Sequence, residues 1–321
     1  MIPQQHTLNT PYLVGPVHCY SAELAGELVL FDCGPPSVEA LTQLQRAIPL
    51  DQLKHIVISH CHLDHYGLAA QLQQQTGAKL YLPYRDHLRL SRAQEHIDGV
   101  VELLREAGFP DKFVTAFSEH ISVPDLIYPT PPSDYLIIEQ ELPARLGISA
   151  LPCPGHSQSD LALCGAGWAV TGDIMLEGIF QAPILEIDLL TGQRFSNYRA
   201  YCTSLERIAT LRDKTILPGH RQQVTSVDNC LLFYLHKLLS RAERVCRFPA
   251  QTSPYEIVER LLGINYQLPY ATYAKASEII FIRDFLADPE RLRTATINTG
   301  LYPLLADQLS AFITDEARRA S

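Results

Sequence analysis

Three histidines and an aspartate crowd into residues 59–65, whose sequence reads SHCHLDH. His60 and His62 lie two positions apart in a turn and can converge on one metal ion. Asp64 and His65 follow where a helix would start, so they can face a second ion. A lone histidine is more often solvated than a ligand, but this spacing favours ligands. The segment predicts one loop that serves two metal ions.

Three later segments share a second pattern, in which an apolar strand ends and a ligand-type residue follows in a glycine-containing turn. The segments read PGH, TGD and PGH, and they end at His156, Asp173 and His220. Functional side chains often lie on such loops at strand ends. If these strands end at one sheet edge, the turns bring all three side chains together.

The elements that would position these residues alternate between strands and helices. Short apolar runs predict strands at residues 17–20, 28–31, 56–58, 79–82, 135–138, 148–151, 161–164, 168–171 and 215–217. Helical spacing predicts helices at residues 38–47, 67–72 and 198–211. This alternation is typical of a layered α/β architecture.

Two regions depart from that alternation. Residues 91–107 form a long amphipathic pattern that ends at Gly108, which predicts a helical insertion at about residues 85–133. Beyond His220 the pattern is mostly helical, and the clearest helices are residues 231–245 and 254–262. We therefore predict a principal domain over residues 1–221 and a mainly helical C-terminal region over residues 222–321.

The order of motifs, HxHxDH followed by PGH, TGD and a final PGH, resembles the metallo-β-lactamase superfamily, especially its glyoxalase II-like branch. The resemblance runs from about residue 10 to 221. It implies an αββα sandwich. Carried over position by position, it implies a first metal ion on His60, His62 and His156, a second on Asp64, His65 and His220, and Asp173 as the bridge between them. We take the carboxylates Asp64 and Asp173 as the catalytic residues.

A site of this kind makes its own nucleophile. Two divalent ions that share Asp173 and a water would lower the pKa of that water towards neutrality and supply a bridging hydroxide. We expect zinc, although histidine and carboxylate ligands also accept iron or manganese. The same chemistry serves thioesters, lactones, β-lactams and phosphodiesters, so the motifs alone do not choose the substrate.

Aromatic residues of the insertion bias that choice. Phe109, Phe113 and Phe117 could form an apolar wall over the metal face, which favours an acyl or otherwise lipophilic substrate. The alternative is that they only pack the insertion onto the domain. Tyr66, beside His65, is a further candidate for orienting substrate, with core packing as its alternative. We predict hydrolysis of a thioester or another carboxylic ester or lactone.

Other polar residues near the motifs have a supporting or a structural interpretation. Asp32 matches an aspartate that supports a ligand in the resembling family, and a turn-capping role explains it equally well. Cys61 should point away from the metals as a small buried hydrophobic residue. Ser157 and Ser159 fit local backbone hydrogen bonds better than a nucleophile.

The composition of the chain limits the kinds of molecule that it is expected to bind. The 321 residues carry a formal net charge of −9 and no run of lysine and arginine, which argues against a nucleic-acid partner and against an RNA-processing nuclease. No apolar run approaches the roughly 18 residues of a membrane span. Eight cysteines without a CxxC pair, and no leader-like N-terminus, predict a cytoplasmic protein with a small-molecule substrate. A phosphodiesterase, an iron-dependent oxidase or sulfur dioxygenase, or a non-catalytic binding protein remain alternatives, and the oligomeric state is open.

Overall fold

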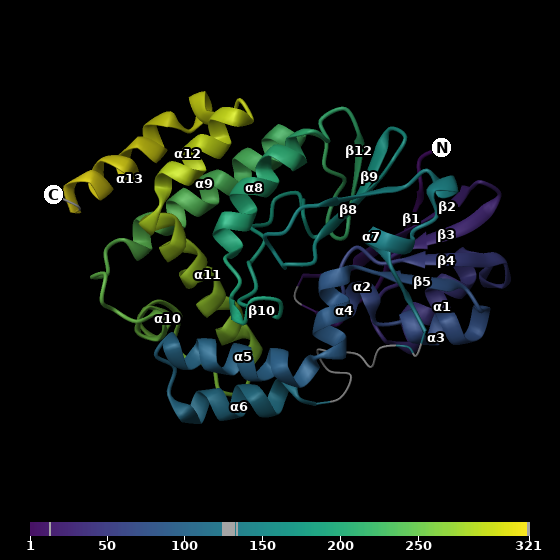
Figure 1. The fold of residues 1–321 in the computed structure, drawn as a ribbon, viewed down its shortest axis with the longest axis horizontal. Helices are drawn as coiled ribbons and strands as arrows, with labels where there is room; N and C mark the ends of the chain where they lie inside the picture. Colours follow the sequence, from purple (N-terminus) through teal and green to yellow (C-terminus); the bar gives the residue numbers. More distant parts are fainter. Residues whose placement is uncertain (13, 124–131, 133, 320–321) are drawn as a thin grey trace.

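The computed structural model describes residues 1–12, 14–123, 132 and 134–319, with only the backbone described for residues 315–319. Two β-sheets pack face to face, and helices cover their outer faces (Figure 1). This arrangement confirms the predicted α/β sandwich.

The first sheet joins an antiparallel N-terminal meander to parallel strands. In order across the sheet, its strands are β1 (Gln4–Leu8), β2 (Val17–Leu24), β3 (Glu27–Phe31), β4 (Leu53–Val57), β5 (Lys79–Leu82) and β6 (Leu136–Ile137). The sequence prediction missed β1. Only His6 and Leu8 of this edge strand are buried, so its sequence lacks an apolar run.

The second sheet carries all three of the later ligand-bearing turns. Its strands, in order, are β12 (Thr215–Pro218), β9 (Trp168–Gly172), β8 (Leu161–Gly165) and β7 (Ser149–Pro152); a separate hairpin pairs β10 (Ile187–Asp188) with β11 (Gln193–Arg194). Because β12 runs parallel to β9, their carboxyl ends meet at the same edge of the sheet.

The helices precede, interrupt and follow these strands. They are α1 (Val38–Ala47), α2 (Leu63–Tyr66), α3 (Ala69–Thr76), α4 (Tyr84–Ser91), α5 (Ala93–Glu106), α6 (Asp111–Ile121), α7 (Ile138–Glu141), α8 (Asn197–Ala209), α9 (Val227–Val245), α10 (Pro254–Leu262), α11 (Pro269–Ala287), α12 (Pro289–Asn298) and α13 (Ala306–Arg319), with short 3₁₀ helices at Leu50–Gln52, Ala144–Leu146 and Tyr302–Leu304. Predicted strand 135–138 is therefore shorter than expected, because its last residue begins α7.

Each central strand contributes side chains to two cores, one between the sheets and one beneath the helices on its outer face. In β4, Ile56 packs towards Leu44 of α1 and Leu72 of α3, whereas Val57 lies in the core between the sheets. In β9, Val170 lies in the same inter-sheet core, and the neighbouring alanine faces the helices on the far side. Because strand side chains point alternately to opposite faces, one short apolar run serves both layers.

Helices α4, α5 and α6 form the predicted insertion, of which residues 124–131 and 133 lie outside the described residues. Phe113 and Phe117 of α6 are almost fully buried and pack in a shared cluster with Tyr273 of α11. Figure 1 shows α5 and α6 beside α10 and α11. The burial of Phe113 and Phe117 favours the packing alternative, in which each ring stabilises the fold by about 1.5–3 kcal/mol, and the substrate wall stays a prediction.

The C-terminal helices share that cluster with α8 and the outer face of the second sheet. Helix α10 has the predicted bounds: Ser253 forms a capping box with Glu256, Pro254 stands at the first turn, and Gly263 ends the helix. The boundary between residues 221 and 222 stays a prediction. In the described part of the chain, no helix is both long and apolar enough to cross a membrane.

Candidate metal centre

The predicted ligands come from five separate places in the fold. His60 and His62 lie in the loop after β4, and Asp64 and His65 belong to the short helix α2. The remaining three follow β7, β9 and β12, and they are His156, Asp173 and His220. The structure brings all seven together in two groups.

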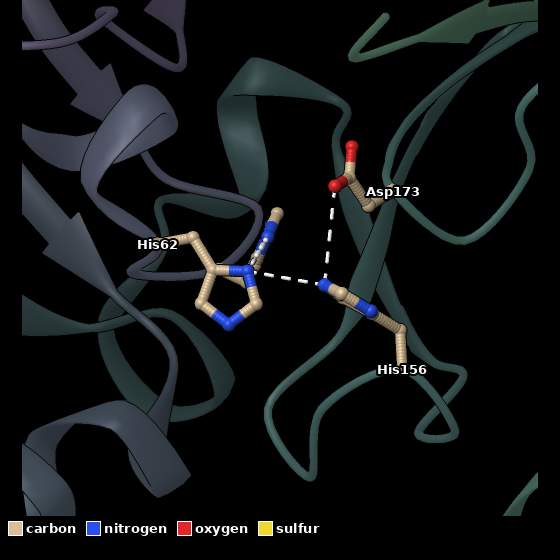
Figure 2. A group of neighbouring side chains, drawn as sticks. His62, His156 and Asp173 are labelled. Atoms are coloured by element: carbon tan, nitrogen blue, oxygen red, sulfur yellow. Dashed lines mark hydrogen bonds and ion pairs between the residues drawn. The ribbon is translucent and has the colours of Figure 1, made fainter. Parts of the chain in front are cut away.

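The first ligand group consists of His60, His62 and His156. Nδ1 of His62 lies 3.0 Å from Nε2 of His60 and 3.0 Å from Nε2 of His156. Figure 2 shows the rings of His62 and His156 converging, with the Asp173 carboxylate beside them. A tetrahedral ion with metal–nitrogen bonds of about 2.0–2.1 Å separates its ligand atoms by roughly 3.3 Å. The spacing therefore suits one ion.

The second ligand group consists of Asp64, His65 and His220. Nε2 of His220 lies 3.2 Å from Oδ2 of Asp64. Asp173 joins the two groups: its Oδ1 lies 3.3 Å from Nε2 of His65 and 3.6 Å from Nε2 of His220, and its Oδ2 lies 3.9 Å from Nε2 of His156. One carboxylate thus faces both groups, as the resemblance implied.

Contacts behind the rings orient four of the histidines. Their Nδ1 atoms each lie within hydrogen-bond distance of an oxygen, namely Ser59 Oγ for His60 (3.2 Å), Asp32 Oδ2 for His65 (2.9 Å), the Ala182 carbonyl for His156 (2.6 Å) and the Pro16 carbonyl for His220 (2.8 Å). A carbonyl or carboxylate can only accept, and the Ser59 hydroxyl already donates to Asp32, so each Nδ1–H donates and each Nε2 is the atom that faces the metal site.

Buried atoms without hydrogen-bond partners show that a cation fits this arrangement. Among the described residues, Nε2 of His65, Nε2 of His220 and Oδ1 of Asp173 are buried and accept or donate no hydrogen bond. An unpaired buried polar atom costs about 1–3 kcal/mol. A divalent ion would satisfy all three atoms at once.

Charges inside the centre differ between the groups. Burial lowers the pKa of His60 well below its ordinary value and that of His62 to about 3, and the neighbouring histidines act in the same direction. Burial alone would also lower the pKa of His65 and His220, but the carboxylates of Asp173 and Asp64 together outweigh it and raise both. His60 and His62 are therefore neutral near pH 7, whereas the raised pKa values of His65 and His220 favour protons that an ion must displace.

Asp32 supports two ligands at once. Its carboxylate accepts hydrogen bonds from the Ser59 N–H (2.7 Å), the Ser59 hydroxyl (2.8 Å) and Nδ1 of His65. It does so from a left-handed backbone conformation, with φ of 54°, which aspartate tolerates better than most residues. Of its two interpretations, the structure favours ligand support.

Two turns need glycine because neighbouring side chains lie too close for a Cβ atom. They are the TGD turn, with Gly172, and the second PGH turn, with Gly219. A Cβ at Gly219 would lie 2.5 Å from Cε1 of His65 and 3.0 Å from Oδ1 of Asp173. A Cβ at Gly172, whose φ is +47°, would lie 2.5 Å from Oγ of Ser59. The turns therefore need glycine because ligands of other loops pack directly against them.

The remaining predicted residues lie away from the centre or are buried. Tyr66 packs in the core of the first sheet, which favours its packing alternative, and its hydroxyl has no hydrogen-bond partner among the described residues. Cys61 is buried in the same core, as predicted. Ser157 donates to Asp160 and contacts Ser159, so both serines serve the local turn.

Sequence reasoning missed the residues that adjoin the first ligand group. A small cavity beside His156 is lined mainly by aromatic and aliphatic side chains, among them Phe180, Tyr201, Tyr234, Leu238 and Phe281. Four of these belong to α8, α9 and α11, and the Tyr234 hydroxyl accepts the N–H of Gln181 at 2.8 Å. No local motif distinguishes these residues from ordinary core positions, so only the fold could reveal them.

Comparisons with known proteins agree with the fold and the motifs. A family model described as the metallo-beta-lactamase superfamily matches residues 12–220. The "Probable metallo-hydrolase YqjP" of Bacillus subtilis is 28% identical over 276 residues, which cover 80% of this chain and 84% of that protein.

Solved structures share the fold at lower identity. A metallo-beta-lactamase family protein of Thermus thermophilus superposes with a TM-score of 0.69 at 20% identity, over 89% of this chain and 94% of that one. A beta-lactamase domain protein of Burkholderia ambifaria gives a TM-score of 0.67 at 19% identity, over 88% and 86%. Both similarities extend well beyond residue 220, so they include helices of the C-terminal region.

Proposed function

The chain belongs to the metallo-beta-lactamase superfamily, and on that premise we propose that it is a binuclear hydrolase of thioesters or of other carboxylic esters and lactones. Its character as a metal-dependent hydrolase agrees with the metallo-hydrolase relative and with the two candidate ligand groups. The substrate class is the proposal.

The observation that carries the proposal is the position of Asp173 between two complete ligand groups. Two ions held there would activate water and polarise a substrate oxygen. The protein contributes the orientation: fixed Nδ1 contacts aim the histidine rings, and the buried carboxylate of Asp173 stays charged because His65 and His220 hold its pKa well below the usual range against the effect of burial. We propose zinc as the metal.

The cavity beside His156 has a volume of only about 10 Å³, room for about one water, so it does not enclose a substrate, but its apolar lining favours the approach of an uncharged acyl group. Its lining contains no lysine or arginine, and Phe180 and Phe281 present apolar rings to it. A phosphodiester would need cationic partners, and the chain's net charge of −9 works against one. A small-molecule ester is the class that this surface fits best.

Turnover measured on a panel of thioesters, lactones and phosphodiesters, with metal content determined on the same sample, tests the proposal. We expect close to two ions per chain and turnover of thioesters or lactones. Turnover of phosphodiesters alone, or oxygen consumption by an iron-loaded sample, would replace the ester proposal. A protein that holds no more than one ion after exposure to zinc, iron and manganese would contradict the binuclear centre.

A further inference from the structure

Helix α4 of the insertion buries a charged pair directly behind the metal-binding loop. Asp86 is 1% exposed and Arg89 is 6% exposed, and Nη2 of Arg89 donates to Oδ1 of Asp86 at 2.7 Å. Charged side chains are rarely buried this deeply, because removing them from water costs several kcal/mol per ion. The burial of this pair therefore indicates that its contacts have a specific role.

Both members of the pair hold the backbone of Cys61. Oδ2 of Asp86 accepts the Cys61 N–H at 2.7 Å, and Nη2 of Arg89 donates to the Cys61 carbonyl at 2.8 Å. Cys61 lies between His60 and His62, so its two peptide planes set the directions in which these ligands leave the chain. The pair thus fixes the part of the loop that carries two nitrogen ligands of the first group.

A second buried contact reaches the loop of the third ligand. Oε2 of Glu186 accepts the N–H of Gln158 at 3.0 Å, two residues after His156, and Nε2 of His96 on α5 lies 3.7 Å from Oε1 of Glu186. Burial alone would raise the pKa of Glu186, but His96 and the charge of Arg89 lower it to about 2, so the carboxylate stays ionised. Helix α4 therefore holds one loop of the first group directly, and α5 reaches the other loop through Glu186, which directly precedes β10.

The second ligand group is held differently. His65 is oriented by Asp32, which follows β3, and His220 by the carbonyl of Pro16, which precedes β2. The contacts that orient these two ligands thus come from the ends of sheet strands rather than from α4 or α5. Among the contacts described, those of the insertion reach the loops of the first group, and those that orient His65 and His220 come from elsewhere.

We infer that Asp86, Arg89 and Glu186 are positioning residues for the first metal ion, so that the insertion acts on the centre by fixing ligand spacing. The inference rests on the ligand assignment of the proposed function. Residues that hold metal ligands in place commonly change metal affinity by about 10–100-fold when they are replaced. A role limited to folding would instead affect both ions and the stability together.

Zinc affinity measured in two single-group backgrounds separates these possibilities. His220→Ala leaves the first group intact, and His62→Ala leaves the second. In the first background, we expect Arg89→Lys and Asp86→Asn to weaken zinc binding by about 10–100-fold, because lysine cannot reproduce the arginine contacts and asparagine cannot accept from both sides. In the second background, we expect changes below about twofold.

Arg85→Lys is the matched control, since Arg85 lies one turn away on α4 and pairs with Asp188 instead. It should leave both affinities unchanged. Circular dichroism and thermal unfolding of the metal-free variants report folding independently of activity. Glu186→Gln, which keeps an oxygen for the Gln158 N–H, provides a milder variant and should weaken the first site by less than about tenfold.

Equal weakening in both backgrounds, or unchanged zinc binding to the first group in Arg89→Lys, Asp86→Asn and Glu186→Gln, would overturn the inference. Absence of zinc binding in the unsubstituted protein would instead refute the proposed function, so the two failures are distinguishable.

Discussion

The two ligand groups use similar side chains, but different elements of the fold hold them in place. The first group stands on loops, and its His62 and His156 remain partly exposed. The second group is deeper: His65 and His220 are completely buried, and strand ends of the first sheet hold them. The first sheet therefore orients His65 and His220 and, through Asp32 and Ser59, also His60, whereas the loops of the first group have additional support from the insertion.

The groups also differ in charge. His60 and His62 of the first group are neutral imidazoles, while the second group combines two histidines of raised pKa with the carboxylate of Asp64. Before any ion binds, the histidines of the second group attract the carboxylates of Asp64 and Asp173. Metal binding replaces these histidine–carboxylate contacts with bonds to the ion. Metal affinity at the two sites should therefore respond differently to protons and to local packing.

Removal of the shared carboxylate should erase the difference between the groups. In Asp173→Ala both groups lose a partner, so we expect hydrolysis to fall by at least about 10³-fold and the metal content to fall below two ions per chain. Asp284→Ala, which removes an ion pair with Arg194 elsewhere, serves as the control and should retain activity. Full activity in Asp173→Ala would exclude this residue from the bridge.

Acidification should affect the second group more than the first. The raised pKa values of His65 and His220 keep protons on these rings further up the pH scale, so zinc affinity there should fall as the pH falls. His60 and His62 have lowered pKa values and stay neutral across this range. Between pH 8 and pH 6, zinc titrations of the His62→Ala variant should show a loss of affinity that grows as the pH falls, with a limit of about tenfold per pH unit for each proton displaced.

The His220→Ala variant should show a clearly smaller loss over the same range. Equal slopes in the two variants would mean that the electrostatic contrast between the groups is absent in solution.

Glycine replacements should damage the groups by local crowding. In Gly219→Ala the added methyl group meets His65 and Asp173, so the second ion should bind about tenfold more weakly. Gly147→Ala strains the backbone, with φ of +65°, a strain that Gly219→Ala lacks, but it has open space around it and should leave zinc binding unchanged. A similar loss in both variants would show that a general loss of stability, not contact with the ligands, weakens the site.

The smallest effect on catalysis is expected from the insertion's aromatic core. Because Phe113 is buried against Phe109 and Phe117, Phe113→Leu should lower the free energy of unfolding by about 1 kcal/mol. The ratio of kcat/KM between long and short acyl substrates should stay within about twofold. Phe180→Leu, beside His156, should change that ratio more than Phe113→Leu does. A larger change in Phe113→Leu would instead support a substrate role for Phe113.

Local sequence was sufficient for the motifs and for much of the fold. The loop after β4, the PGH and TGD turns and the bounds of α10 could all be predicted, because strand alternation, capping and tight turns depend on residues within a few positions of each other. For the same reason, the strong histidine spacing of residues 59–65 indicated a metal site without any knowledge of the partners behind it.

Tertiary structure decided the rest, because it depends on contacts between distant parts of the chain. The orientation of His220 by Pro16 joins residues 204 positions apart, and nothing local to either residue signals it. An amphipathic helix also presents the same pattern whether its apolar face lines a pocket or a core. Only the packed fold shows that Phe113 fills a core, that C-terminal helices contribute to the cavity, and that Asp86 and Arg89 hold the ligand loop.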